Sequence, residues 1–214
     1  MLADFIPALP VLATFVTASL VLALTPGPDM TLFLSKTIAQ SKLAGLASIA
    51  GASMGLVIHS ILVAAGLSVL LAASVVAFTV LKVVGALYLV YLAIDALRHG
   101  SSLNLDRKLP PEPLRIVFLK GMLIDLLNPK VIIFFVTFLP QFVSPHDPHA
   151  AKKMLFLGLV YAVINVPICS PLILFADRIA ALLKRSPKAT RAVDYLFATV
   201  LGGFAVKLVL TQTK

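Results

Sequence analysis

Six long apolar segments constrain this chain more than any other feature. About 20 apolar residues are enough for a helix to cross the hydrocarbon core of a bilayer. Hydrophobic residues make up 60% of the chain and charged residues only 13%, whereas a soluble domain has about 25% charged residues. The sequence therefore predicts an all-α polytopic membrane protein with six transmembrane helices. The six segments run roughly over 5–35, 44–72, 78–97, 116–143, 154–176 and 193–210.

The basic residues are distributed unevenly between the two sides of these segments. Twelve fall in or beside the loops after the first, third and fifth segments, namely Lys36, Lys42, Arg98, Arg107, Lys108, Arg115, Lys120, Arg178, Lys184, Arg185, Lys188 and Arg191. The other side has four, namely Lys152, Lys153, Lys207 and Lys214. The positive-inside rule places the twelve in the cytoplasm and both termini outside. This bias also explains the net charge of +9 without a nucleic-acid partner.

The segment 98–115, "RHGSSLNLDRKLPPEPLR", is polar and rich in proline. It divides a single transmembrane domain, 1–214, into two halves of three spans, about 5–97 and about 116–210. Because three is an odd number, the second half enters the membrane from the opposite side. The sequence therefore predicts an inverted 3+3 repeat, as in many transporters.

Matching motifs in the two halves support this repeat. "LTP" at Leu24–Pro26 corresponds to "LNP" at Leu127–Pro129 with an offset of 103 residues. The same offset relates Gly55 to Gly158. A further shift of 14 residues within 177–192 also aligns Gly85 with Gly202.

The "LTP" and "LNP" motifs predict a break in the first and fourth spans. Thr25 and Asn128 can cap a helix with side-chain oxygens, and Pro26 and Pro129 suit the first helical position. A half-helix that begins inside the membrane offers free N–H groups and partial positive charge, which suit a carboxylate. Lys130 would add a full positive charge. The alternative is an ordinary proline kink in each helix.

Four stretches carry a resemblance to a known family: "LALTPGPDM", "GLASIAGASMGLVIH", "GALYLVYLAIDALR" and "GMLIDLLNPKVIIFFVTFLPQFV". Together they resemble the LysE/RhtB family of amino-acid exporters over about residues 10–210. The resemblance implies a six-helix inverted repeat and proton-driven efflux of small amino acids or related solutes. The matching motif positions are Thr25, Pro26, Gly27, Pro28, Asn128, Pro129 and Lys130, and we expect them to bind substrate.

Three titratable residues are candidates for proton coupling. Asp29 and Asp125 flank the two predicted breaks, and acids inside a membrane are functional candidates by default. His59 follows Gly51 and Gly55 at intervals of four, so all three share one helix face. The unperturbed pKa of histidine lies near physiological pH. The structural alternatives are a helix-capping role for Asp29, an interfacial position for Asp125, and a neutral packing role for His59.

The fifth span carries Asn165 together with Pro167 and Pro171, which predict a third irregularity. Asn165 is a further candidate for lining the substrate path. We expect no cofactor and no metal, because the sequence has no nucleotide-binding or hydrolase motif and Cys169 is the sole cysteine. Any transport must then be secondary rather than driven by ATP.

We interpret the chain as a secondary exporter of amino acids or similar zwitterionic solutes in the inner (plasma) membrane, working by proton antiport. Its expected partners are the substrate, protons and membrane lipids, and a homodimer through small-residue seams is possible. The alternatives are a membrane-embedded enzyme acting on a lipid or phosphorylated carrier, and a passive channel. An enzyme would need Arg, His and acidic groups clustered at one membrane surface, but this sequence scatters them.

The predicted topology can be tested with reporter fusions at Ser102 and at Lys214. A reporter that works only in the cytoplasm should be active at Ser102 and silent at Lys214, because the basic residues hold the 98–115 linker inside. Activity of that reporter at Lys214 would contradict the topology.

Overall fold

The computed structural model describes residues 6–24, 27–67, 111–144 and 147–176, with single residues between 76 and 98 and between 178 and 206. Most of the predicted third and sixth spans lies outside these residues. So do Thr25, Pro26, Gly85, linker residues 99–110 and both chain ends. Every regular element within the described ranges is helical, as predicted.

Two of the predicted spans are each built from two helices that meet at a bend. The first consists of α1 (Leu9–Leu24) and α2 (Pro28–Ala39), bent by 53°. The other begins with α6 (Leu114–Leu126) and bends by 52° into α7 (Pro129–Ile133). A π-helical turn η2 (Phe134–Phe138) and a 3-10 turn η3 (Leu139–Phe142) continue α7. Both bends lie beside the proline motifs at which the sequence predicts a break.

The other two described spans are unbroken. They are α3 (Lys42–Leu62), which ends in the π-helical turn η1 (Val63–Leu67), and α8 (Ala150–Leu174). Both are long and apolar enough to cross a membrane, so the described residues supply two spans, or four if each bent pair is one. Pro167 and Pro171, which predict an irregularity in the fifth span, both lie inside α8 and do not interrupt it.

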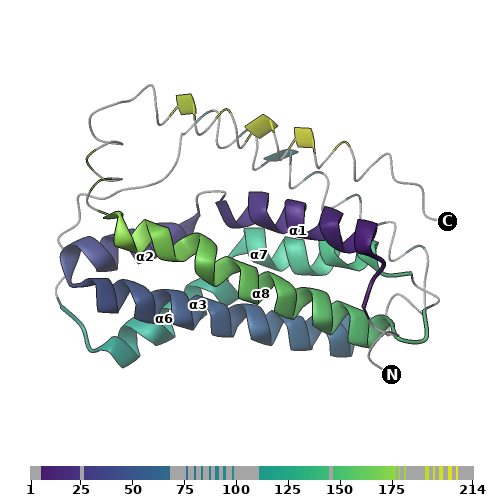
Figure 1. The fold of residues 1–214 in the computed structure, drawn as a ribbon, viewed down its shortest axis with the longest axis horizontal. Helices are drawn as coiled ribbons and strands as arrows, with labels where there is room; N and C mark the ends of the chain where they lie inside the picture. The colour runs from purple at the N-terminus through teal and green to yellow at the C-terminus, as the bar shows by residue number, and fades with distance from the viewer. Residues whose placement is uncertain are drawn as a thin grey trace.

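The helices pack into a bundle in which α3 contacts α2, α6 and α8 (Figure 1). Glycines allow α3 and α6 to touch backbone to backbone. A Cβ on Gly51 would collide with the backbone of Phe118, and one on Gly121 would collide with the backbone of Ser48. In lipid there is no hydrophobic driving force between helices, so the van der Waals contacts of such close packing stabilise their association. The seam of Gly51 and Gly55 is thus buried within the chain, so it does not provide the predicted dimer contact.

Aromatic rings fill the space between α1, η2, η3 and α8. Phe134 packs against Phe15, with ring centroids 6.0 Å apart, and against Tyr161 at 4.6 Å. Phe142 meets Phe15 edge-on at 5.2 Å. These contacts fix the second bent span against the first half of the chain, beyond the break.

One assumption in the count of basic residues is corrected. Lys36 was assigned to the loop after the first span, but it lies in the last turn of α2 and is 1% exposed. Its Nζ is 3.3 Å from the carboxylate of Glu112, just before α6. Lys36 is therefore a buried, paired charge rather than a residue of an open loop.

The glycine seam leads to a prediction about stability. Gly51→Ala should lower the free energy of unfolding by about 1–3 kcal/mol, because the new methyl group meets backbone atoms that cannot easily move. Thermal unfolding in detergent can be followed with a dye that reacts with the buried thiol of Cys169. Gly66→Ala is the matched control, because a Cβ there has no heavy atom within 4 Å. Equal unfolding temperatures for the two variants would contradict this account of the seam.

Candidate functional site

The first break creates a helix start at Pro28, two residues later than the predicted Thr25-Pro26. Gly27 is the N-cap of α2 in extended conformation, and no side chain caps the helix. Pro28 takes the first helical position, which tolerates proline because its missing N–H would have had no helical partner. Asp29 lies in the first turn, as predicted, where the helix dipole favours its anion.

The second break begins α7 as the sequence predicts. Asn128 is the N-cap, and its Oδ1 accepts a hydrogen bond from the backbone N–H of Lys130 at 3.1 Å. Pro129 occupies the first helical position. This hydrogen bond leaves the Asn128 amide nitrogen free to point away from its own helix.

That amide nitrogen joins the two breaks. Asn128 Nδ2 donates to Asp29 Oδ1 at 3.2 Å, across 99 residues of chain. Lys130 Nζ is 3.8 Å from Asp29 Oδ2 and donates to the Leu22 carbonyl near the end of α1 at 3.5 Å. All three side chains are buried. We call Asp29, Asn128 and Lys130 the break cluster.

Gly27 provides the space that the break cluster occupies. A Cβ at this position would lie 2.6 Å from Asp29 Oδ1 and 3.2 Å from Lys130 Nζ. Any larger residue would push the carboxylate and the ammonium group apart. The glycine is therefore needed for side-chain space, since its extended backbone is open to any residue.

The break cluster also revises the expected use of the helix starts. The sequence suggested that a substrate carboxylate would lie between them. In the structure the protein's own carboxylate, Asp29, fills that place. Breaking such a buried pair by removing one partner typically costs about 3–5 kcal/mol, because the other charge is left uncompensated. A ligand that enters here must therefore replace or rearrange these contacts.

A second buried carboxylate lies close by. Asp125 is 2% exposed, near the end of α6, and packs against Gly55 of α3. Its backbone is a hydrogen-bond partner of His59. Asp125 Oδ2 and His59 Nε2 are both buried, and neither has a hydrogen-bond partner among the described residues. Asp125 is thus enclosed by protein.

Electrostatics connects Asp125 to the break cluster. Asp29 and Lys130 both lie close enough to Asp125 to interact with its charge. The site therefore contains two carboxylates and one lysine. If all three groups are ionised, the site carries one net negative charge. Burying an unbalanced charge is costly, so the site favours one additional cation, either a proton or a bound ligand.

His59 and Asn165 lie at the margins of this site. The His59 ring stacks on Phe135 of η2 with centroids 5.3 Å apart, so it occupies a packed seam. Asn165, on α8, is buried, and its Oδ1 accepts a weak hydrogen bond from Cys169 Sγ at 3.4 Å. The described contacts do not join Asn165 directly to the break cluster.

Sequence reasoning missed Tyr161 as a site residue. It lies on α8, 2% exposed, within electrostatic range of Asp29 and Asp125. Its position four residues before Asn165 on the same helix face is the signal that could have found it. Among the described residues, no group of three His, Cys, Asp or Glu side chains is arranged to hold a metal ion.

Comparisons with known proteins agree with a transport role. Residues 20–212 match the family model described as "LysE type translocator". Proteins of this family are transporters, so the chain is a membrane transport protein and not an enzyme. No solved structure matches this chain.

Curated relatives cover nearly the whole chain. The homoserine/homoserine lactone efflux protein of Salmonella typhimurium is 32% identical over 186 residues, which are 87% of this chain and 89% of that protein. An uncharacterized membrane protein of Bacillus subtilis is 27% identical, covering 92% and 97% of the two chains. Because the family model spans both breaks and the Salmonella relative is 32% identical over 87% of the chain, this chain belongs to the LysE type translocator family.

Proposed function

We propose that this chain is a secondary active exporter of homoserine-like amino acids and their uncharged-carboxyl derivatives, working by proton antiport in the plasma membrane. Asp29, Asn128, Lys130 and Asp125 form its central site. The observation that carries the proposal is the buried hydrogen bond between Asp29 and Asn128, which brings the two helix breaks together. Irregular backbone at membrane depth is tolerated where it is buried in protein or lines a water-filled cavity.

The geometry of the two bent spans supports an inverted repeat. Their bends of 53° and 52° are nearly equal, and each is followed by a helix with proline at its first position. The two unbroken helices, α3 and α8, each follow a bent span in the chain. Movement of one half against the other would expose the central site to each side in turn.

The chemistry of the relative's substrates suggests how the site divides its work. Homoserine and its lactone share an amino group, but the lactone has no free carboxylate. A site that accepts both must rely on the ammonium group. A buried carboxylate whose oxygen has no hydrogen-bond partner suits that role, and Asp125 Oδ2 is such a group. The Lys130 ammonium and the helix starts would receive the carboxylate of homoserine when it is present.

The charge balance of the site suggests the coupling mechanism. With Asp29 paired to Lys130, Asp125 is neutral only when it carries a proton or a substrate ammonium. The two cations would then compete for one carboxylate. After the substrate is released outside, Asp125 would bind a proton, and the transporter would return to the inward-facing state in that form. Because one carboxylate cannot hold both cations, substrate export and proton entry would be coupled. Of the predicted coupling residues, this mechanism selects Asp125, while Asp29 holds Lys130 in place.

Two roles remain as sequence-based proposals. Asn165 and the segment Thr25–Pro28 would line the path to the central site, and His59 would relay protons to Asp125. The hydrogen bond between the His59 side chain and the Asp125 backbone keeps the imidazole close to this residue, which supports the proposed relay.

Replacing the cap of α7 separates function from stability. Asn128→Ala should reduce homoserine efflux from loaded proteoliposomes at least tenfold, because it frees Asp29 from its amide donor. Loss of a cap typically costs about 0.5–2 kcal/mol of stability. Ser41→Ala removes the comparable cap of α3, where Ser41 accepts from the Ala44 N–H at 3.1 Å, and should leave transport near the wild-type rate. Similar transport by both variants would contradict a role for Asn128 in the site.

Competition between substrate and proton predicts a pH dependence that Asp125→Asn removes. Binding of labelled homoserine lactone to the wild-type protein should weaken as the pH falls, because protons occupy Asp125. Asp125→Asn should lose both proton-driven efflux and substrate exchange, since it removes the shared carboxylate. Asp147→Asn is the matched control. Asp147 lies in the loop before α8 and forms an ion pair with Lys153 in the first turn of that helix.

His59→Gln distinguishes a relay from the binding group. It should slow proton-driven efflux and preserve substrate exchange without a gradient. If Asp125→Asn retains proton-driven efflux at the wild-type rate, the competition mechanism is wrong.

A further inference from the structure

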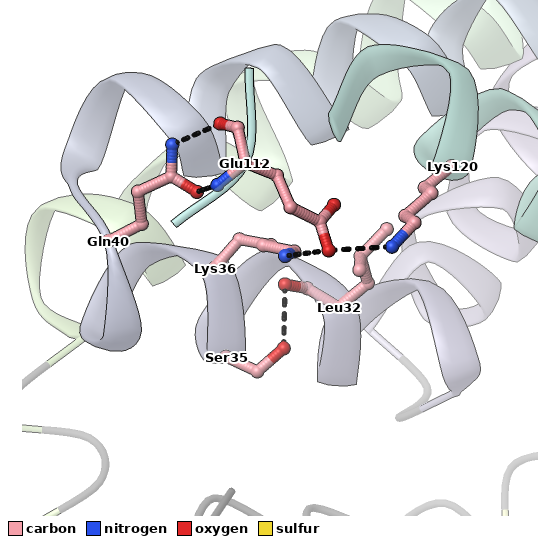
Figure 2. A network of polar contacts seen from close by, with 6 residues as sticks. All are labelled: Leu32, Ser35, Lys36, Gln40, Glu112 and Lys120. Atoms are coloured by element: carbon pink, nitrogen blue, oxygen red, sulfur yellow. Dashed lines mark hydrogen bonds and ion pairs between the residues drawn. The ribbon is translucent and has the colours of Figure 1, made fainter. Parts of the chain in front are cut away.

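A second polar network lies at the end of α2 and is separate from the break cluster. Glu112 Oε1 is 2.7 Å from Lys120 Nζ and 3.3 Å from Lys36 Nζ. Figure 2 shows the two lysines pointing toward the same carboxylate oxygen, Lys36 from α2 and Lys120 from α6. Two ammonium groups therefore share one carboxylate.

Gln40 holds the backbone of Glu112 in position. Its Nε2 donates to the Glu112 carbonyl at 2.6 Å, and its Oε1 accepts from the Glu112 N–H at 3.0 Å (Figure 2). This pair of hydrogen bonds connects the residue after α2 to the segment before α6, 72 positions away. The network thus joins the first half of the chain to the second at one end of the bundle.

Lys36 is the unusual member of the network. It is 1% exposed, and within the described residues its Nζ has an ion pair but no hydrogen bond. Its ion partner is Glu112, whose other oxygen, Oε2, is also buried without a hydrogen-bond partner among those residues. Lys120, by contrast, has a side chain that is 47% exposed. A buried ammonium group that has an ion pair but no hydrogen bond is suited to exchanging one anion for another.

The position of Lys36 relates the network to the central site. Lys36 follows Asp29 by seven residues, so the two lie on one face of α2, about 10 Å apart along the helix axis. Leu32 and Phe33 lie on the same face between them and are buried. The network therefore closes one end of a buried helix face that begins at the break cluster.

Glu112 is ionised at neutral pH. The hydrogen bond from Lys120 is the largest influence and holds the pKa of the Glu112 carboxyl below its usual range; burial raises this pKa, and the nearby Lys36 ammonium group lowers it further. A change of pH near neutrality therefore does not release the pair. What can release it is another anion that competes for Lys36.

We propose that Lys36 and Glu112 form an ionic gate on the cytoplasmic end of the transport path, and that an incoming substrate carboxylate replaces Glu112 on Lys36 to open it. The cytoplasmic assignment follows from the basic residues near this end, and the gate rests on the transport function proposed above. When Glu112 leaves, Lys36 would remain buried without a counter-ion, which is unfavourable. A carboxylate substrate supplies that counter-ion at the moment of opening. Lys36 is thus a first binding group for carboxylate-bearing substrates, ahead of the central site.

Two substrates that differ in the carboxylate test the binding role of Lys36. In inside-out vesicles, Lys36→Gln should raise the KM for homoserine at least tenfold and leave the KM for homoserine lactone within about twofold, since the lactone has no carboxylate to bind. Lys120→Gln, in the same network but exposed, should change neither KM by more than about twofold. Lys36→Arg keeps the charge and should retain most of the affinity for homoserine. An equal KM change for both substrates in Lys36→Gln would overturn the binding role.

Accessibility tests the gate itself and does not depend on whether Lys36→Gln folds. In a Cys169→Ser background, the Leu32→Cys variant should react with a membrane-impermeant maleimide from the cytoplasmic side at least tenfold faster when Glu112→Gln is added. Substitution of Asp147 by Asn in place of Glu112→Gln is the control and should have no effect. Unchanged labelling in Glu112→Gln would overturn the gate. A wild-type protein that exports neither substrate would instead refute the transport function and leave the labelling result to decide the gate.

Discussion

The rest of the site depends on one buried hydrogen bond, between the amide of Asn128 and the carboxylate of Asp29. It works because each helix break leaves a polar group that its own helix does not use fully. The side-chain oxygen of Asn128 caps α7, and its amide nitrogen can still donate a hydrogen bond to another helix. Asp29 sits in the first turn of α2, where the dipole favours its charge. The two breaks therefore satisfy each other, and Lys130 balances the carboxylate at 3.8 Å.

This arrangement places an unbalanced charge beside the two helix breaks. Asp29 and Lys130 form a pair, and Asp125 adds a second carboxylate within electrostatic range. A soluble protein could leave such a group in water. In this apolar chain the Asp125 side chain, on α6, is buried against Gly55 of α3. Its negative charge is therefore stable only with a cation beside it. In the antiport mechanism proposed above, the substrate ammonium group and the proton would supply that cation in turn.

The contacts between the two halves differ in strength and location. Along α3 and α6, Gly51 and Gly121 bring backbones into contact, which makes that seam rigid. At the end of α2, the halves meet through Lys36, Glu112 and Gln40, which are polar and exchangeable groups. Backbone packing therefore lies beside an ionic contact in one interface, and the gate proposed above would use the ionic part.

The sequence by itself determined the membrane class, the break in each bent span and the residues beside each break. Apolar length and proline position act locally, so they can be recognised without knowing what lies across the bundle. Local rules also explain the errors. Pro167 and Pro171 were expected to interrupt the fifth span, but α8 continues through both. The start of α2 moved from Thr25-Pro26 to Pro28, because the motif offers two prolines and only packing chooses between them.

Only the tertiary structure decided which groups meet. Nothing in the chain order indicates that Asn128 donates to a residue 99 positions away, or that Lys36, counted as a loop residue, is buried against Glu112. The same holds for Tyr161, which lies on α8 within electrostatic range of Asp29 and Asp125. Partners across helices depend on rotation and separation that arise when all helices pack at once. A hydropathy pattern encodes the helix and its apolar length, whereas the pairing of buried charges is settled by the cost of leaving any one of them alone.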